Sequence, residues 1–142
     1  LYTWEVNRIW ADQGPALRED FDPRGHFLNA AYAFGPKLTA VGFVYLTDPD
    51  QDFFRSFGSQ TYGVRLTGAL PFDERISFPY RFSYAYQEDW GNNETAYGAH
   101  YGWAELGVAV AKLATFSAGY EHLGSDTDAV VVTPFATAHK FN

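Results

Sequence analysis

Hydrophobic and polar residues alternate along much of this chain, most clearly between Ile76 and Glu88. Alternation with a period of two is typical of a β-strand whose two faces meet different surroundings. One face of this segment is hydrophobic and mostly aromatic, while the other is small or polar. The first face consists of Ile76, Phe78, Tyr80, Phe82, Tyr84 and Tyr86, and the second of Ser77, Pro79, Arg81, Ser83, Ala85 and Gln87.

The same alternation recurs in six other segments. Gln60–Leu70 and Leu113–Leu123 are as regular, again with small or polar residues opposite the hydrophobic ones. Four segments alternate less strictly and carry hydrophobic residues on both faces: Leu1–Ile9, His26–Phe34, Leu38–Thr47 and Ala96–Val110. The chain therefore predicts an all-β fold of about seven strands.

The connections between these segments alternate between long and short. Long ones fall near Trp10–Gly25 and Asp48–Ser59, and Asp89–Thr95 is of medium length. The connections Gly35–Lys37, Pro71–Arg75 and Ala111–Lys112 are short. In an up-and-down sheet this places the long loops at one rim and the tight turns at the other, as in outer-membrane barrels. The strands of about 9–13 residues also exceed the usual 5–6 and suit a bilayer crossing. We therefore expect an antiparallel up-and-down transmembrane β-barrel.

Length and composition narrow the possibilities further. The 142 residues suit one domain, and the pattern is already under way at Leu1 and still running at Asn142, so residues 1–142 are expected to be part of a single outer-membrane barrel, incomplete at both ends. The absence of cysteine excludes disulfide scaffolds and thiolate sites. A formal net charge of −7 disfavours nucleic acid as a partner. No apolar stretch approaches the roughly 18 residues of a transmembrane helix.

A soluble protein remains the alternative, because alternation alone does not say which face is inside. A soluble antiparallel β-barrel would turn the aromatic faces inward and could enclose an apolar ligand there. The serine, threonine and arginine faces would then meet water. The continuous aromatic face and the loop asymmetry favour the membrane barrel.

Two arginines on the polar faces are the main candidates for a functional site. If the short turn is centred near Asp73, Arg65 lies directly opposite Arg81. Like charges so placed need water, a carboxylate or a passing anion between them, which predicts an anion-selective pore lining. The alternative is a structural salt-bridge ladder with Glu105 or Glu121. Of these two carboxylates, the alternation predicts a lumen-facing position for Glu121.

The sequence offers little support for metal binding or catalysis. The alternating carboxylates Asp48, Asp50 and Asp52 could reach one Ca²⁺, but the segment lacks the glycine and terminal glutamate of a calcium loop. The four histidines accompany no serine elbow, no H-E-x-x-H motif and no glycine-rich phosphate loop. We therefore predict no metal site, no cofactor and no enzymatic activity.

Several segments of the chain share a pattern with known proteins. They are His26–Tyr32, Lys37–Ala40 with Tyr45–Leu46, Ser59–Arg65, Gly119–Glu121 with Leu123–Gly124, and Thr133–Asn142. Together these segments resemble the alginate export family of outer-membrane porins.

The resemblance implies a passive, monomeric outer-membrane channel of roughly 16–18 strands. It would pass an anionic polysaccharide such as alginate, or a similar anionic solute, with possible periplasmic export partners. It also implies that Lys140 lies in a loop at the pore mouth.

Overall fold

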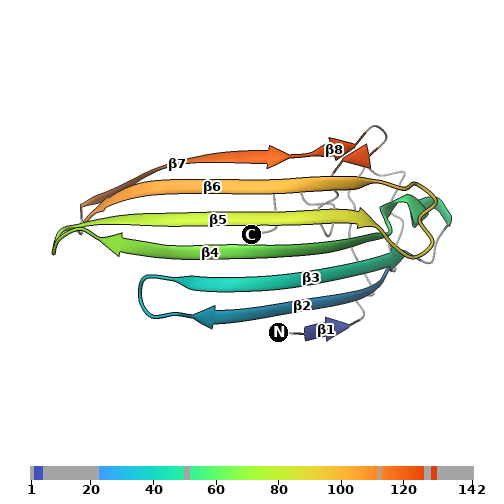
Figure 1. The fold of residues 1–142 in the computed structure, drawn as a ribbon, viewed down its shortest axis with the longest axis horizontal. Helices are drawn as coiled ribbons and strands as arrows, with labels where there is room; N and C mark the ends of the chain where they lie inside the picture. Colours follow the sequence, from blue (N-terminus) through green and yellow to red (C-terminus); the bar gives the residue numbers. More distant parts are fainter. Residues whose placement is uncertain (1, 5–22, 50–51, 112, 127–128, 131–142) are drawn as a thin grey trace, which may run out of the picture.

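The computed structural model describes residues 2–4, 23–49, 52–111, 113–126 and 129–130. They form one antiparallel meander sheet in which every strand pairs with its neighbours in sequence (Figure 1). Six strands are long and a seventh, β1, has three described residues. The strands are β1 (Tyr2–Trp4), β2 (Pro23–Ala33), β3 (Thr39–Pro49), β4 (Ser59–Pro71), β5 (Ile76–Asp89), β6 (Gly98–Val110) and β7 (Ala114–Leu123).

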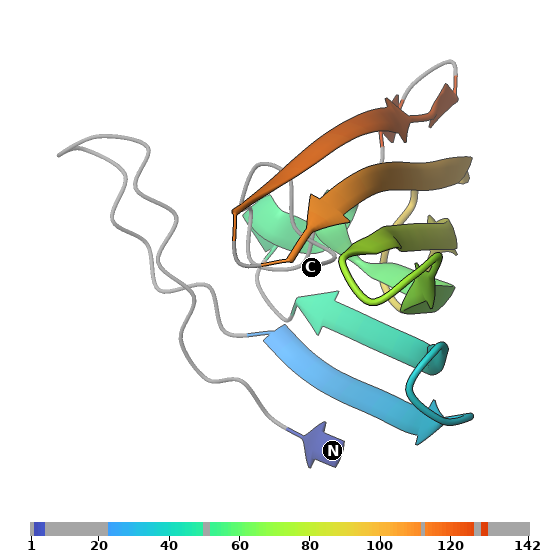
Figure 2. The ribbon, with the colours of Figure 1, turned by 90° about the vertical axis from the view of Figure 1, so that its left-hand side faces the viewer.

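The predicted all-β, up-and-down arrangement is confirmed for these strands, but the sheet is not closed into a barrel. β1 and β7 form its two edges. Figure 2 shows the long strands arranged along an arc, so the sheet is bent into an open trough. A short separate hairpin, β8 (Ser125–Asp126) with β9 (Ala129–Val130), was not predicted from the sequence.

Long and short connections lie at opposite ends of the sheet, as the sequence predicts (Figure 1). At one end are the 3-10 helix η1 (Asp52–Phe57) and the loop between β5 and β6. At the other end, Gly35 has a φ of 104°, a left-handed conformation that favours glycine, in the turn between β2 and β3. Within the described residues there is no helix with the length and hydropathy that a membrane crossing requires.

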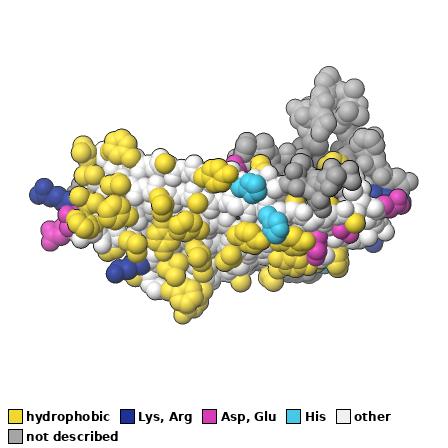
Figure 3. Space-filling model, turned by 45° about the horizontal axis from the view of Figure 1, so that its top comes forward, with side chains coloured by type: hydrophobic (Ala, Val, Ile, Leu, Met, Phe, Trp, Pro, Cys, Tyr) yellow, Lys and Arg dark blue, Asp and Glu magenta, His cyan; other side chains and the backbone are white. Residues whose placement is uncertain are grey.

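The two faces of the sheet have opposite character, and the polar one is the more buried. On the polar face, Thr61 and Gln87 are only 1% exposed, and Gln87 Nε2 donates to Thr61 Oγ1 at 2.8 Å. On the other face the central positions are hydrophobic, glycine or histidine, and large side chains stand exposed; Leu106, for example, is 60% exposed. Figure 3 shows hydrophobic side chains spread across the surface, with histidines among them and charged groups mainly toward the strand ends.

Aromatic rings lie over glycines on the polar face. The ring of Phe43 covers its cross-strand neighbour Gly63, and the indole of Trp103 lies 3.4 Å from where a Cβ of Gly119 would be. Phe43 is thereby 3% exposed and packs in the small core with Tyr97 and Tyr101. A glycine opposite an aromatic residue lets the ring lie flat on the sheet, which leaves this face crowded in places and polar in others.

Candidate functional site

The centre of the polar face contains two adjacent rows of cross-strand neighbours, which we call the central rows. The hydrogen-bond register of β3 to β7 fixes which residues belong to each row. The first row is Val41, Arg65, Ser83, Trp103 and Glu121, and the second is Thr39, Thr67, Arg81, Glu105 and Gly119. The predicted lumen-side phase of Glu121 therefore agrees with the register, and both arginines share its face.

The predicted direct opposition of Arg65 and Arg81 is wrong. Arg65 pairs with Ser83, and Arg81 pairs with Thr67, so the two arginines are diagonal neighbours. Cβ atoms at diagonal positions are about 7–8 Å apart or somewhat less, which weakens the repulsion expected of a direct pair. The two residues still lie on one face, because the error in register is two residues.

The physical reason lies in the turn between β4 and β5. Asp73 Oδ1 accepts the backbone N–H groups of both Arg75 and Ile76 at 2.7 Å. Phe72 N–H donates to the Ile76 carbonyl at 2.9 Å, which closes the turn around the Asp73 side chain. This capped turn is centred one residue later than Asp73, and each residue of displacement in a turn moves the pairing by two.

The register brings Glu105 directly opposite Arg81. The sequence does not show on which face of its strand Glu105 lies, because that strand carries hydrophobic residues on both faces. Within the part of the chain that the structure describes, Arg81 and Glu105 make no ion pair with each other. The salt-bridge ladder considered from the sequence is therefore possible by register, but this pair does not form it here.

Among the described residues, the first central row includes buried polar atoms without a hydrogen-bond partner. They include Arg65 Nε, Ser83 Oγ and Trp103 Nε1, and Ser83 as a whole is 6% exposed. Leaving a buried donor or acceptor unsatisfied costs about 1–3 kcal/mol. The row therefore retains a capacity to bind acceptor groups. Neither Ser83 nor Trp103 was predicted as a site residue from the sequence. The alternation places Ser83 on the face of the arginines, but the phase of the strand that contains Trp103 was open.

Tyr101 lies on the polar face next to the first central row, two residues before Trp103 on β6. It is 1% exposed, and its hydroxyl lies within electrostatic reach of both Arg65 and Glu121. At the long-loop end, outside the strands, burial and, to a smaller extent, the charge of Asp89 raise the pKa of Tyr97 to about 12. The Tyr97 phenol is therefore neutral at physiological pH.

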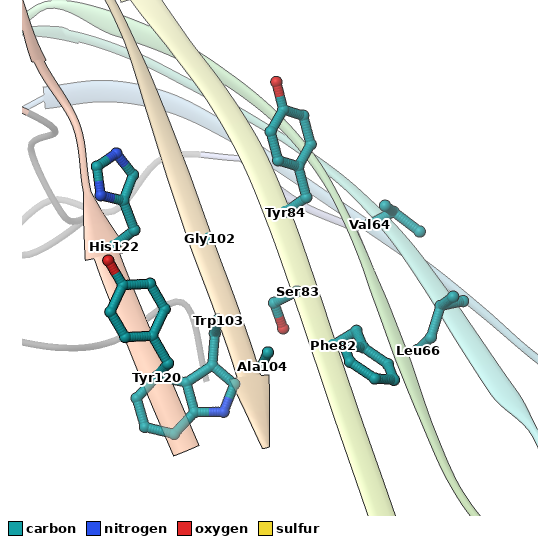
Figure 4. A pocket seen from close by; sticks show the side chains of 10 residues that line it. All are labelled: Val64, Leu66, Phe82, Ser83, Tyr84, Gly102, Trp103, Ala104, Tyr120 and His122. Atoms are coloured by element: carbon teal, nitrogen blue, oxygen red, sulfur yellow. The ribbon is translucent and has the colours of Figure 1, made fainter. Parts of the chain in front are cut away.

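The hydrophobic face has a shallow groove of about 360 Å³ over β4 to β7 (Figure 4). Its lining includes Gly102 and Ala104, with Phe82 and Tyr84 on one side and Tyr120 on the other. A Cβ on Gly102 would find only the His122 Cβ, 3.9 Å away. Ser83 and Trp103 also belong to the lining, although the register places their side chains on the polar face.

One edge of this groove is polar. The Tyr84 hydroxyl and His100 Nδ1 are 2.7 Å apart, within hydrogen-bond distance, and the Tyr86 and His100 rings lie 5.0 Å apart. Toward the long-loop end, Gln60 Nε2 donates to Glu88 Oε1 at 2.8 Å. The face thus passes from hydrophobic to tyrosine and histidine and then to charged residues along the strands.

Two of the residues considered from the sequence lie outside the described residues. They are Lys140, predicted at a pore mouth, and Asp50 of the carboxylate cluster. Asp48 lies near the end of β3, and its Oδ1 accepts a hydrogen bond at 3.1 Å from the backbone N–H of Asn92, which is in the loop that follows β5. No group of three or more potential metal ligands occurs among the residues that are described.

No protein-family model matches this chain, and neither a curated protein nor a solved structure is found to be similar to it. The resemblance of individual segments to alginate export porins therefore stays a prediction. The physical basis for a function is the polarity of the two sheet faces and the charges of the central rows.

Proposed function

We propose that this chain forms part of the wall of a membrane-spanning β-barrel channel in a bacterial outer membrane. The hydrophobic face contacts lipid and the polar face lines an aqueous path. The observation that carries the proposal is the inverted polarity of the sheet, with exposed hydrophobic and buried polar side chains. A monomeric soluble protein rarely exposes a continuous apolar surface of this extent.

The dimensions of the hydrophobic face support a bilayer crossing. From Ile76 to Tyr86 the strand advances about 34 Å, which corresponds to about 26 Å along the membrane normal at a tilt of about 40°. The apolar band of outer-membrane barrels is about 25 Å tall. Among the described strand residues, the charged ones on this face lie toward the long-loop ends of the strands, at Arg24, Asp48 and Glu88. The uncharged band therefore has the height that lipid contact requires.

The solute we propose carries an anionic group, and the channel is passive. Arg65 and Arg81 offer guanidinium donors on the polar face, which hold a carboxylate without the tight, permanent binding that would stop conduction. The segment resemblance to alginate export porins supports an acidic polysaccharide or a similar anionic solute. Neither an enzymatic reaction nor a cofactor is part of this proposal.

The test is single-channel conductance of the full-length protein in a planar bilayer, with and without an oligouronate. We expect an anion-selective current that the oligouronate blocks. The double variant Arg65→Ala, Arg81→Ala should raise the blocking concentration at least about tenfold, because charge-assisted hydrogen bonds contribute about 1.5–3 kcal/mol each. Arg75→Ala, in an exposed turn, is the matched control and should leave block unchanged.

The possible outcomes separate the parts of the proposal. A channel that is indifferent to the oligouronate and to the double variant would contradict the acidic solute but not the barrel. A protein that forms no channel would contradict the membrane function. The soluble barrel enclosing an apolar ligand would then become the better hypothesis.

A further inference from the structure

The charges at the centre of the polar face are separated by strand. The positive residues Arg65 and Arg81 lie on β4 and β5, and the negative residues Glu105 and Glu121 lie on β6 and β7. Among the described residues, these four are the charged side chains of the two central rows. Their formal charges cancel, so the rows carry a dipole across the sheet instead of a net positive charge. A pure anion attracted by the arginines is also repelled by the glutamates.

Further groups reinforce the positive end. Ser83 lies between Arg65 and Trp103 in the first row, is 6% exposed, and has an Oγ without a partner. Arg65 Nε is likewise buried and without a partner in the described structure. Two guanidinium groups and a hydroxyl on neighbouring strands form a suitable donor set for one carboxylate.

An aromatic ring accompanies the negative end. Trp103 is the cross-strand neighbour of Glu121, and its indole lies over Gly119, the cross-strand neighbour of Glu105. An indole face beside carboxylates attracts an ammonium group through both cation–π and ionic interactions. The two halves of the rows thus recognise opposite charges.

We propose that the central rows form a subsite for a compact zwitterion such as an amino acid. Its carboxylate is held by Arg65, Arg81 and Ser83, and its ammonium group is held by Glu105, Glu121 and the Trp103 ring. Neighbouring strands are about 4.8 Å apart, so a molecule whose two charges are a few ångströms apart spans from β5 to β6. This subsite rests on the proposed function, since it requires the polar face to line an aqueous path, and extends that function from anions to dipolar solutes.

The experiment compares uptake of radiolabelled β-alanine and propionate, a zwitterion and an anion of similar size, into liposomes containing the full-length protein. Uptake into protein-free liposomes is subtracted, because neutral propionic acid crosses lipid without a channel. At low solute concentration, weak binding in the channel raises the flux. We expect β-alanine to enter about threefold faster than propionate, the size of effect that one partly exposed ionic contact gives. The double variant Glu105→Gln, Glu121→Gln should reverse this ratio, whereas Glu74→Gln in the exposed β4–β5 turn should not change it.

Two results would overturn the subsite in distinguishable ways. Uptake of both solutes with a ratio that the double variant does not change would exclude the zwitterion subsite and leave the channel intact. Uptake of neither solute would overturn the channel and the subsite together. If the double variant does not insert, the single variants Glu105→Gln and Glu121→Gln serve instead, and each should lower the ratio part of the way. Trp103→Phe, which keeps an aromatic ring, should lower it less than Trp103→Ala.

Discussion

Glycines at two positions show how the faces differ at the scale of single residues. Gly63 lies on the polar face beneath the Phe43 ring, so a Cβ there would collide with the ring. Gly102 lies in the hydrophobic groove, where a Cβ would meet ordinary van der Waals contact with His122 only. The same residue type therefore permits close packing at one position and leaves open space at the other.

Alanine substitutions at these two glycines should have opposite effects on stability. Gly63→Ala should lower the free energy of unfolding by about 1–3 kcal/mol, because the crowded ring must move. Gly102→Ala should leave the free energy of unfolding unchanged or raise it by about 0.5–1 kcal/mol. The reason is that alanine loses less conformational entropy than glycine when the strand folds. Urea unfolding of the protein reconstituted in lipid measures both. Equal effects would contradict the packing described for Phe43.

At the scale of strands, lysine substitutions on the two faces test whether the hydrophobic face contacts lipid. Leu106 on β6 is 60% exposed on the hydrophobic face, and Ser117 on β7 is exposed on the polar face close to it. Leu106→Lys should cost about 2–4 kcal/mol of folding free energy in a bilayer if the residue is near the midplane. Ser117→Lys should cost almost nothing, because water is available to the ammonium group.

The comparison is measured by equilibrium folding of both variants into lipid vesicles. Since Leu106 is already exposed, a water-soluble protein would tolerate lysine there as well as at Ser117. Two equally mild variants would therefore contradict lipid contact of the hydrophobic face. Phe82→Lys, on the adjacent strand, provides a second test of the same surface.

The sequence predicted the strands well because their alternation is unusually long and regular. The segment predicted from Ile76 to Glu88 is β5, Ile76–Asp89, and the segment predicted from Gln60 to Leu70 lies within β4. The pairing register of β4 and β5 was harder to predict from the sequence, because it depends on how the Asp73 side chain caps the turn. The phase of Glu105 was also open, because β6 carries tryptophan and tyrosine on its polar face. For that reason the charge division of the central rows emerges only from the structure.

At the scale of the whole molecule, the described chain is a bent single sheet with one hydrophobic and one polar surface. A single sheet in water has no second layer to cover its hydrophobic side chains, and here they remain exposed. Under the proposed function, lipid would stabilise this arrangement by contacting the hydrophobic surface while water contacts the other. The long connections and the tight turns would then lie at opposite membrane surfaces.

The most direct test of lipid contact is a cysteine scan of β5 in the full-length protein in bilayers, and residues 1–142 contain no native cysteine that would have to be replaced first. Nitroxide labels at residues 77–86 would be examined by electron paramagnetic resonance for collision with oxygen, which concentrates in lipid, and with a water-soluble nickel complex. We predict a period of two, with oxygen contact greatest at Phe78, Phe82 and Tyr84 and nickel contact at Ser77 and Arg81. Labels that are equally accessible to both reagents, or an aromatic face accessible only to nickel, would contradict the membrane-spanning channel wall.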